Sequence, residues 1–155
     1  MSFERQLYVP GKREYIRGKK RPPVDCILCS ILAGDPLVER LLIWDSDLFA
    51  VSANLYPYNP GHLLIFPRRH ILDPRELTAD EISCSVLIHK ACLDALDAAY
   101  QPAGFNLGAN IGEASGASIK HFHTHIVPRY QRELGFVDIC AGAKIMVEDP
   151  HVTME

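Results

Sequence analysis

Three histidines alternate with other residues in the stretch HFHTHIV, which spans residues 121–127. Side chains of a β-strand point alternately to its two faces, so a strand here would place His121, His123 and His125 on one face. Burial of three imidazoles without partners is unfavourable. Neutral imidazole is a good nucleophile, and its ordinary pKa of about 6.5 leaves much of it neutral at pH 7. The pattern therefore predicts a chemical role for this strand.

Three interpretations of the histidines differ in what the rings do. The rings could be exposed at the surface without a role. All three could bind one metal ion, although next-but-one side chains on a strand are about 6.5 to 7 Å apart and three of them converge poorly on one ion. The pattern favours a third interpretation, in which one histidine is structural, one is a nucleophile and one supports the nucleophile.

A loop of small residues precedes the histidines and reads NIGEASGAS from Asn110 to Ser118. Its backbone N–H groups and the Ser118 hydroxyl are suited to binding phosphate oxygens. The loop and the histidines together suggest chemistry at a phosphate group.

Five cysteines are present, of which Cys26 and Cys29 form a C-x-x-C pair. An odd number of cysteines argues against a framework of disulfides. The pair could consist of buried thiols, or it could bind a metal ion.

The elements that position these residues follow from hydrophobic spacing. Strands are expected at 38–44, 48–53, 62–66, 105–109 and 121–127, with further short strands at 136–139 and 144–147. A helical turn is expected at 26–32. The order of the elements predicts an α+β fold, with one long helix and mostly antiparallel strands.

The long helix is expected over 78–100. Thr78 and Glu81 match a capping box at its start, and Pro102 and Gly104 end it. Its apolar face is expected to comprise Ile82, Val86, Cys92, Leu93 and Leu96.

The chain of 155 residues fits one domain over residues 24–155, preceded by a polar arm at 1–23. No apolar run approaches the roughly 18 residues of a membrane helix, and the first residues lack the apolar core of a signal peptide. We expect a cytoplasmic protein that has no membrane partner. The net charge of −3 argues against binding of nucleic acid. Residues 12–21 hold six basic side chains and one acid, which form either a solvated arm or a basic lip that attracts an anionic substrate.

Taken together, these segments resemble the histidine triad family, whose signature is His-φ-His-φ-His-φφ with φ an apolar residue. Thr124 stands at a position that is usually apolar. The spacing from Asn110 through Ser118 to His121 also matches the family, as does the segment 47–69 with Asn54 and Gly61-His62. The resemblance covers about residues 24 to 130.

The resemblance implies a role for each matching residue. His123 would attack the α-phosphorus of a nucleotide and form a nucleotidyl-histidine intermediate. His125 would hydrogen-bond the phosphate, and His62 would lie beside the catalytic strand and help to orient His123. Asn110 and Ser118 would position the phosphates or the leaving group, while Asn54 would hold the ribose hydroxyls.

The C-x-x-C pair resembles the zinc-binding members of the family. There the other two ligands are the histidine that closes a P-x-x-H segment, here His70, and the first histidine of the triad, here His121. Two cysteines and two histidines suit a closed tetrahedral zinc site with a structural role. No organic cofactor is implied.

Three segments, NLYPYNPGHL, GFN and FVDICAGAKI, resemble the diadenosine tetraphosphate phosphorylase branch. In that branch orthophosphate releases the nucleotidyl group, so a dinucleoside polyphosphate yields ATP and ADP. Ala117 replaces a glutamine that many members carry, which removes an amide donor. The alternatives are a dinucleoside polyphosphate hydrolase or nucleoside phosphoramidase, and, in another class, a regulatory module that binds an adenine nucleotide. Family members usually form homodimers through the long helix and an adjoining strand.

Overall fold

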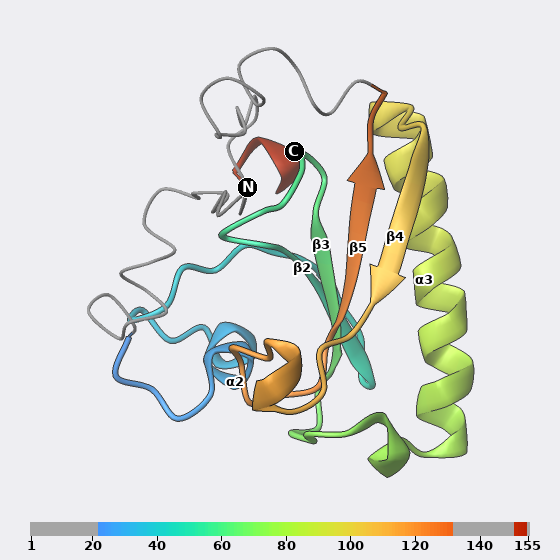
Figure 1. The fold of residues 1–155 in the computed structure, drawn as a ribbon. Helices are drawn as coiled ribbons and strands as arrows, with labels where there is room; N and C mark the ends of the chain where they lie inside the picture. The colour runs from blue at the N-terminus through green and yellow to red at the C-terminus, as the bar shows by residue number, and fades with distance from the viewer. Residues whose placement is uncertain (1–21, 132–150, 155) are drawn as a thin grey trace, which may run out of the picture.

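The computed structural model describes residues 22–131 and 151–154. Five antiparallel strands form one sheet in the order β1-β2-β3-β5-β4 (Figure 1). Their bounds are Leu42–Asp45 (β1), Phe49–Ala53 (β2), Leu63–Pro67 (β3), Gly104–Gly108 (β4) and Thr124–Arg129 (β5). The prediction of an α+β fold with one long helix and mostly antiparallel strands is confirmed. The short strands expected at 136–139 and 144–147 lie outside the described residues.

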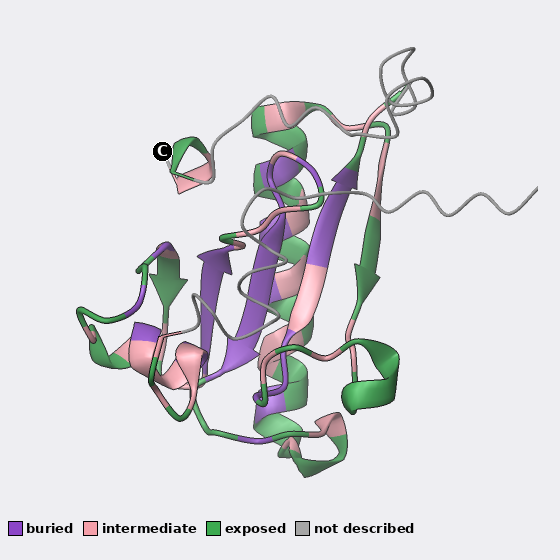
Figure 2. Cartoon of the chain, turned by 60° about the vertical axis from the view of Figure 1, so that its left-hand side comes forward, coloured by how far each residue is buried: buried purple, intermediate pink, exposed green. Residues whose placement is uncertain are grey.

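Alternation of side chains along the central strands creates two apolar layers. One face packs against helix α3 (Ala79–Tyr100) and includes Leu63, Ile65 and Ile126. The other face packs against helix α2 (Ile27–Ala33) and includes Leu64 and Phe66. The two helices therefore cover opposite faces of the sheet, and the central strands are buried (Figures 1 and 2). Each buried large apolar side chain contributes about 1.5 to 3 kcal/mol, so the two layers hold the sheet between the helices.

The capping box predicted for the long helix is present. The Thr78 side chain accepts a hydrogen bond from the backbone N–H of Glu81, and the Glu81 carboxylate accepts one from the backbone N–H of Thr78. The predicted apolar face was partly wrong, because Ile82 and Val86 are 51% and 64% exposed. The first turn instead turns Glu81 inward, where the carboxylate binds Arg69. None of the described helices is long and apolar enough to cross a membrane.

Helix α2 begins immediately after the first cysteine of the C-x-x-C pair. Cys26 is its N-cap, and the sulfur accepts a hydrogen bond from the backbone N–H of Cys29. Gly34 ends the helix in the left-handed region at φ 69°, which suits a residue without a Cβ. Short 3-10 turns lie at Pro74–Glu76, Glu113–Ser115 and Val152–Met154.

Two strands begin later than the sequence pattern predicted. Strand β1 begins at Leu42, and the residues just before it turn the side chains of Val38 and Leu41 into the core. Strand β5 begins at Thr124, because the backbone N–H of Phe122 donates to the Ile71 carbonyl instead of entering the ladder. The predicted strand over 121–127 was therefore wrong for its first three residues, and of the three histidines only His125 lies in a strand.

Candidate functional site

His123 lies in the turn that leads into β5, and its ring lines a cavity of about 380 Å³ on the α2 side of the sheet. The side chain is only 4% exposed. The cavity also brings together His125, Asn54, Asn110 and Ser118. Segments that are far apart in the sequence thus place all five predicted nucleotide-site residues around one space.

The protonation state of His123 is set by its surroundings. Nδ1 donates a hydrogen bond to the backbone carbonyl of His121 at 2.7 Å, which assigns the proton of the neutral ring to Nδ1 and the lone pair to Nε2. Burial lowers the pKa of His123, and the hydrogen bond to the His121 carbonyl opposes this fall. The ring is therefore held neutral, which is the form that can act as a nucleophile.

His62 supports the second histidine of the site. Nε2 of His62 lies 2.9 Å from Nδ1 of His125, and the backbone N–H of Tyr58 donates to Nδ1 of His62 at 3.0 Å. Since Nδ1 of His62 accepts, its proton lies on Nε2 and is donated to His125. This chain of donors assigns the proton of neutral His125 to Nε2. His62 hydrogen-bonds His125 directly, whereas the family resemblance implied that it helps to orient His123.

Rings gather around His125. The ring centroid of His123 lies 4.9 Å from that of His125 in an edge-to-face arrangement. Tyr58 stacks on His62 with centroids 4.9 Å apart. Tyr58 was not singled out from the sequence, although an aromatic residue between two prolines, three residues before the Gly-His pair, is a usable signal.

The remaining cavity wall is largely apolar. Asn54 is tied in place, because its Oδ1 accepts from the backbone N–H of Tyr56 at 3.0 Å and its Nδ2 lies 3.3 Å from His62. The loop before the histidines carries Gly112 and Gly116, both at positive φ, so it turns sharply beside the cavity. Apolar lining comes from α2, from the segment before β1, from β3 and from the loop before the histidines: Ile27, Ile31, Val38, Leu41, Leu64 and Ile119. An apolar wall with a few polar groups is typical of a site for a small organic ligand.

His121 belongs to a second site, on the other side of the same turn. Cys26, Cys29, His70 and His121 place one potential ligand atom each within 4.8 Å of one another. Nδ1 of His121 lies 3.3 Å from the sulfur of Cys26, and Nδ1 of His70 lies 3.4 Å from the sulfur of Cys29. Two sulfurs and two nitrogens at these separations can bind a metal ion.

Backbone contacts prepare His121 for this role. Its Nε2–H donates to the Pro67 carbonyl at 2.9 Å, so the lone pair of Nδ1 points to the cysteines. Burial lowers the pKa of His121 to about 4, against the hydrogen bond to Pro67. Burial also raises the pKa of Cys29 to about 11, with the neighbouring Cys26 sulfur adding to the rise. A bound cation would favour the ionised form of the Cys29 thiol.

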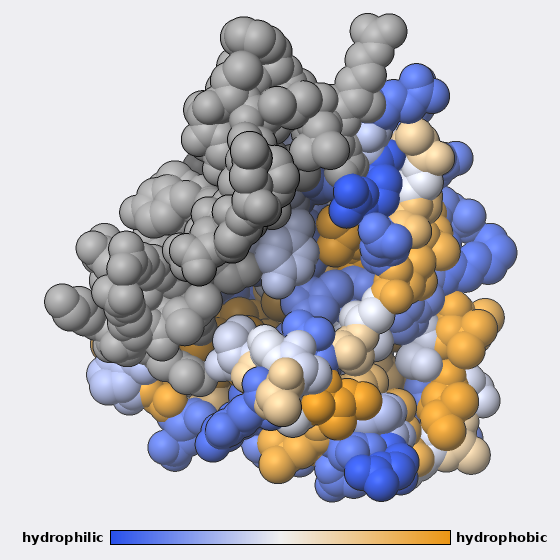
Figure 3. Space-filling model, in the orientation of Figure 1, coloured by the Kyte–Doolittle hydropathy of each residue, from blue (hydrophilic) through white to orange (hydrophobic). Residues whose placement is uncertain are grey.

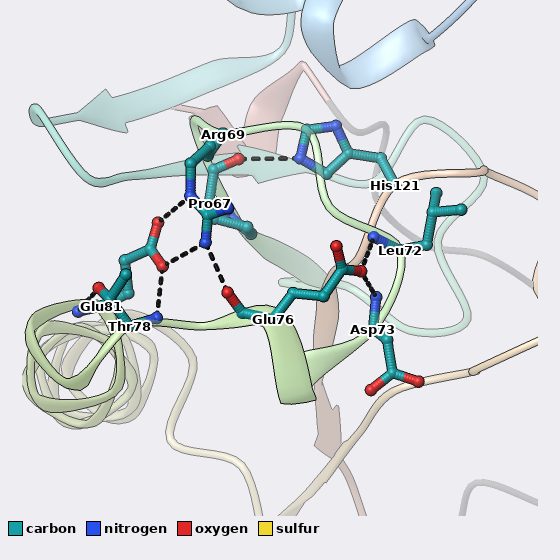
Figure 4. Close-up of polar contacts among 8 residues, drawn as sticks. All are labelled: Pro67, Arg69, Leu72, Asp73, Glu76, Thr78, Glu81 and His121. Atoms are coloured by element: carbon teal, nitrogen blue, oxygen red, sulfur yellow. Dashed lines mark hydrogen bonds and ion pairs between the residues drawn. The ribbon is translucent and has the colours of Figure 1, made fainter.

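The turn that carries Pro67 and His70 is braced by an ion pair. Arg69 donates to both oxygens of the Glu81 carboxylate, at 3.1 and 2.9 Å, and to the Glu76 carbonyl (Figure 4). Figure 4 also shows His121 bonded to Pro67 on the same turn. Helix α3 is thereby connected to the cysteine and histidine cluster. The sequence reasoning identified Glu81 only as a cap and missed Arg69.

The prediction that all three histidines share one face was wrong for His121. His123 and His125 line the cavity, while His121 joins the cysteine cluster. The interpretation of three exposed histidines was also wrong, since His121 and His123 are 2% and 4% exposed. Within the described part of the chain, the one cluster suited to a metal ion contains a single member of the trio, which favours a division of tasks.

Comparison with known proteins agrees with this geometry. Residues 38–132 match the HIT domain family, so the chain belongs to the HIT family. A HIT family protein from Bacillus anthracis has the same fold, with a TM-score of 0.64 and 30% identity; the match covers 68% of this chain and 74% of that one.

Two curated relatives carry the names of enzymes. An AP-4-A phosphorylase of Mycobacterium tuberculosis is 34% identical over 109 residues, which cover 70% of this chain and 56% of the relative. Adenylylsulfatase HINT3 of Arabidopsis thaliana is 29% identical over 109 residues, which cover 70% of this chain and 54% of the relative. The chain thus spans little more than half the length of these relatives, both of which are named as nucleotide-processing enzymes.

Proposed function

We propose that this protein transfers a nucleotidyl group from a dinucleoside polyphosphate, through an intermediate on His123, to orthophosphate. The observation that carries the proposal is the state of His123, whose Nδ1 is bound to the His121 carbonyl while its neutral ring lines the cavity. The similarity to the AP-4-A phosphorylase of Mycobacterium tuberculosis supports the choice of substrate and acceptor.

In the first step the lone pair on Nε2 of His123 forms a bond to the α-phosphorus. The bond from this phosphorus to the bridging oxygen breaks, and its electron pair leaves with the nucleoside triphosphate. The Nε2–H of His125 donates to a non-bridging oxygen, where charge accumulates in the transition state. Asn110 and Ser118 bind neighbouring phosphate oxygens, and Asn54 binds the ribose. A polyphosphate leaves readily, so this step needs no strong general acid.

In the second step an oxygen of orthophosphate attacks the same phosphorus. The bond between phosphorus and Nε2 breaks, and the electron pair returns to the His123 ring. Diadenosine tetraphosphate and phosphate would thus give ATP and ADP. Ala117 leaves the position before Ser118 without an amide donor, which makes water activation by a glutamine impossible at that position.

The test is to incubate the protein with diadenosine tetraphosphate, with and without orthophosphate, and to separate the nucleotides. ATP and ADP that form only with phosphate would support the proposal. Products that form equally well without phosphate would mean hydrolysis, and tight binding without products would mean a regulatory module. Without phosphate, wild-type protein should also accumulate a labelled nucleotidyl group that is stable in alkali and labile in acid, as expected for a phosphorus–nitrogen bond.

His123→Ala should abolish both turnover and labelling. We expect turnover to fall by at least about a thousandfold, since the first step loses its nucleophile. Asp94→Asn is a control, because Asp94 is an exposed residue of α3 that pairs with Lys90 and does not line the cavity. If His123→Ala retained turnover within about tenfold of wild type, the mechanism would be refuted.

We also propose that the cysteine and histidine cluster binds a structural Zn²⁺ through Cys26, Cys29, His70 and His121. Support comes from the donor set, from the spacing of the ligand atoms within 4.8 Å, and from the orientation of His121 by Pro67. The ion would connect the start of α2 to the turn that carries His123. Protein purified with zinc should hold one ion per chain by atomic emission. Cys26→Ser should lose the ion, whereas Cys84→Ser, a change of another half-buried cysteine on α3, should retain it.

We further propose a homodimer formed through α3 and β4. Large apolar side chains are exposed on these elements at Ile82, Val86, Leu87 and Leu107. Figure 3 shows apolar surface on the side of the molecule that carries α3 and β4 in Figure 1. Light scattering after gel filtration should give twice the chain mass. Val86→Glu should shift the protein to monomer, while Trp44→Glu on the other edge of the sheet should not. A monomeric wild type would refute this proposal.

A further inference from the structure

We propose that His89 is a positioning residue, which holds the catalytic strand in place through the hydroxyl of Thr124. The inference rests on the proposed nucleotidyl transfer at His123. Thr124 lies between His123 and His125 in the chain, and it stands where the family signature has an apolar residue. His89 lies on α3, on the opposite side of the sheet from the cavity.

The sheet separates the two sides of this arrangement. His125 pairs with Leu64, and both line the cavity. Thr124 pairs with Ile65, which belongs to the apolar layer against α3. The side chain of Thr124 thus projects from the back of the strand toward the helix. Ile126 of β5 belongs to the same apolar layer as Ile88 of α3, and Figure 1 shows α3 running alongside the sheet.

Two hydrogen bonds hold His89 in one orientation. Nδ1 lies 2.6 Å from the Ser85 carbonyl of the same helix, and a carbonyl can only accept. In the neutral ring Nε2 is therefore an acceptor, and it lies 2.8 Å from Oγ1 of Thr124. The Thr124 hydroxyl donates its single proton to this nitrogen, because its other acceptor, the Ile65 carbonyl, lies farther away at 3.4 Å. Because the ring is anchored to its own helix, the position of the hydroxyl is set by α3.

Thr124 is the point at which the catalytic turn joins the sheet. The ladder between β3 and β5 extends only to the pair of Thr124 with Ile65, so His123 lies outside it. Among the described residues, the backbone just before it makes one backbone–backbone hydrogen bond to the rest of the fold, from the Phe122 N–H to the Ile71 carbonyl, and the His121 side chain adds the bond to Pro67. An apolar side chain at position 124 would pack against α3 without a directed bond. A hydroxyl bonded to His89 instead fixes both the distance and the direction of Thr124 relative to α3. Thr124 is the residue directly between the nucleophile His123 and His125.

This contact matters for rate because a nucleophile must be held close to its in-line position. Small displacements of a reacting group reduce the rate even when the ligand still binds. Loss of the bond should therefore lower kcat and leave KM nearly unchanged, since the groups that line the cavity stay in place. The expected loss is about fivefold, which is the typical net worth of one neutral hydrogen bond.

The first experiment is a double-mutant cycle on phosphorolysis of diadenosine tetraphosphate. Thr124→Val, which keeps the size but removes the donor, should lower kcat about fivefold with KM within about twofold. Thr124→Ser should restore most of the activity. His89→Phe should cause a similar loss, and the double variant should be no worse than either single variant. If the kcat of the double variant fell by the product of the two single losses, the proposal would be overturned.

A control separates positioning from general loosening of the core. Cys92→Ala removes a buried sulfur from the same layer between α3 and the sheet, where no hydrogen bond to β5 is involved. Its thermal stability should fall at least as far as that of Thr124→Val, with kcat nearly unchanged. An equal loss of kcat in Cys92→Ala would overturn the proposal.

The second experiment does not depend on turnover. In protein labelled with ¹⁵N-histidine, the ring resonances of His123 and His125 should shift in Thr124→Val and in His89→Phe, but not in Cys92→Ala. Unchanged resonances would overturn the positioning role even if the enzyme is active. If wild type instead shows no turnover, the proposed function fails while these spectra still decide the role of His89.

Discussion

The buried carboxylate of Glu81 should make the free energy of unfolding depend on pH, and the substitution Glu81→Gln should reveal this dependence. Glu81 is 3% exposed, accepts two hydrogen bonds from Arg69 and caps the first turn of α3 through the Thr78 N–H. Figure 4 shows that the same turn carries Pro67, which orients His121. Glu81→Gln keeps the size of the side chain and removes its charge. It should therefore weaken both the helix start and the turn beside the cysteine and histidine cluster.

The magnitude follows from the pKa. Hydrogen bonding from Arg69 is the largest cause that lowers the pKa of Glu81 from 4.5 to about 2, against an opposing effect of burial. At about 1.4 kcal/mol per pKa unit, this corresponds to about 3 kcal/mol. The Arg69 side chain is 50% exposed, so solvent screens part of the attraction. We therefore expect Glu81→Gln to reduce the free energy of unfolding by about 2 kcal/mol at pH 6.

The pH dependence has a defined sign. A carboxylate whose pKa is lowered by folding stabilises the protein above its unfolded pKa, and the contribution is lost as the pH falls toward its folded pKa. The difference between wild type and Glu81→Gln should thus be constant above about pH 5. It should shrink steadily from there toward about pH 2, because protonated glutamate resembles glutamine. Urea unfolding of both proteins between pH 7 and pH 2.5, followed by circular dichroism, measures this difference.

A matched control is available on the same helix. Asp94 pairs with Lys90 at the surface, and its side chain is 65% exposed. Asp94→Asn should change the free energy of unfolding by less than about 0.5 kcal/mol, at any pH in the range. The reasoning would be refuted if Glu81→Gln behaved like Asp94→Asn, or if its effect were the same at pH 3 as at pH 6.

Three further predictions concern the site and the loop before β3. Gly61→Ala should lower the free energy of unfolding by about 2 kcal/mol, because φ is +76° and a Cβ would lie 3.1 Å from Leu96; an unchanged urea midpoint would contradict this. His62→Phe should lower kcat about tenfold, because His125 loses its donor; a kcat equal to wild type would show that His125 is positioned by other groups. Among the described residues that line the cavity, Glu39 is the one formally charged side chain, so basic residues elsewhere are needed for a polyphosphate. Replacing Lys19, Lys20 and Arg21 by glutamine should raise KM for diadenosine tetraphosphate and flatten its dependence on salt, whereas an unchanged KM would support a merely solvated arm.

The sequence predicted helices and strands well where a short run of neighbouring residues sets the structure. The capping box of Thr78 and Glu81 marked the start of α3. The two strands joined by the turn at 45–47, and the strand predicted at 62–66, lie within a few residues of their expected positions. Boundaries failed where a long-range contact competes with the pattern. Residues 121–123 alternate like a strand, but the Phe122 N–H bonds the Ile71 carbonyl and the strand starts later.

The apolar face of α3 shows the same limit. Ile82 and Val86 have helical spacing, yet they are exposed because the first turn faces inward with Glu81. A carboxylate normally stays in water, and an apolar side chain on the same helix would normally take the buried position. Here Glu81 is buried instead, because Arg69 donates two hydrogen bonds to its carboxylate. Periodicity cannot reveal such a partner, since it lies twelve residues away on another element.

By itself, the sequence determined which chemical groups are present and which short segments carry them: the alternating histidines, the small-residue loop, the C-x-x-C pair and the helix cap. The tertiary structure decided how those groups divide. His121 lies beside the cysteines, whereas His123 and His125 line the cavity. On the other face of the sheet, Thr124 is hydrogen-bonded to His89. The physical reason is that residue type and local spacing act over one strand or one turn of helix, whereas burial, tautomer and pKa depend on atoms that only the packed sheet and helices bring within hydrogen-bond distance.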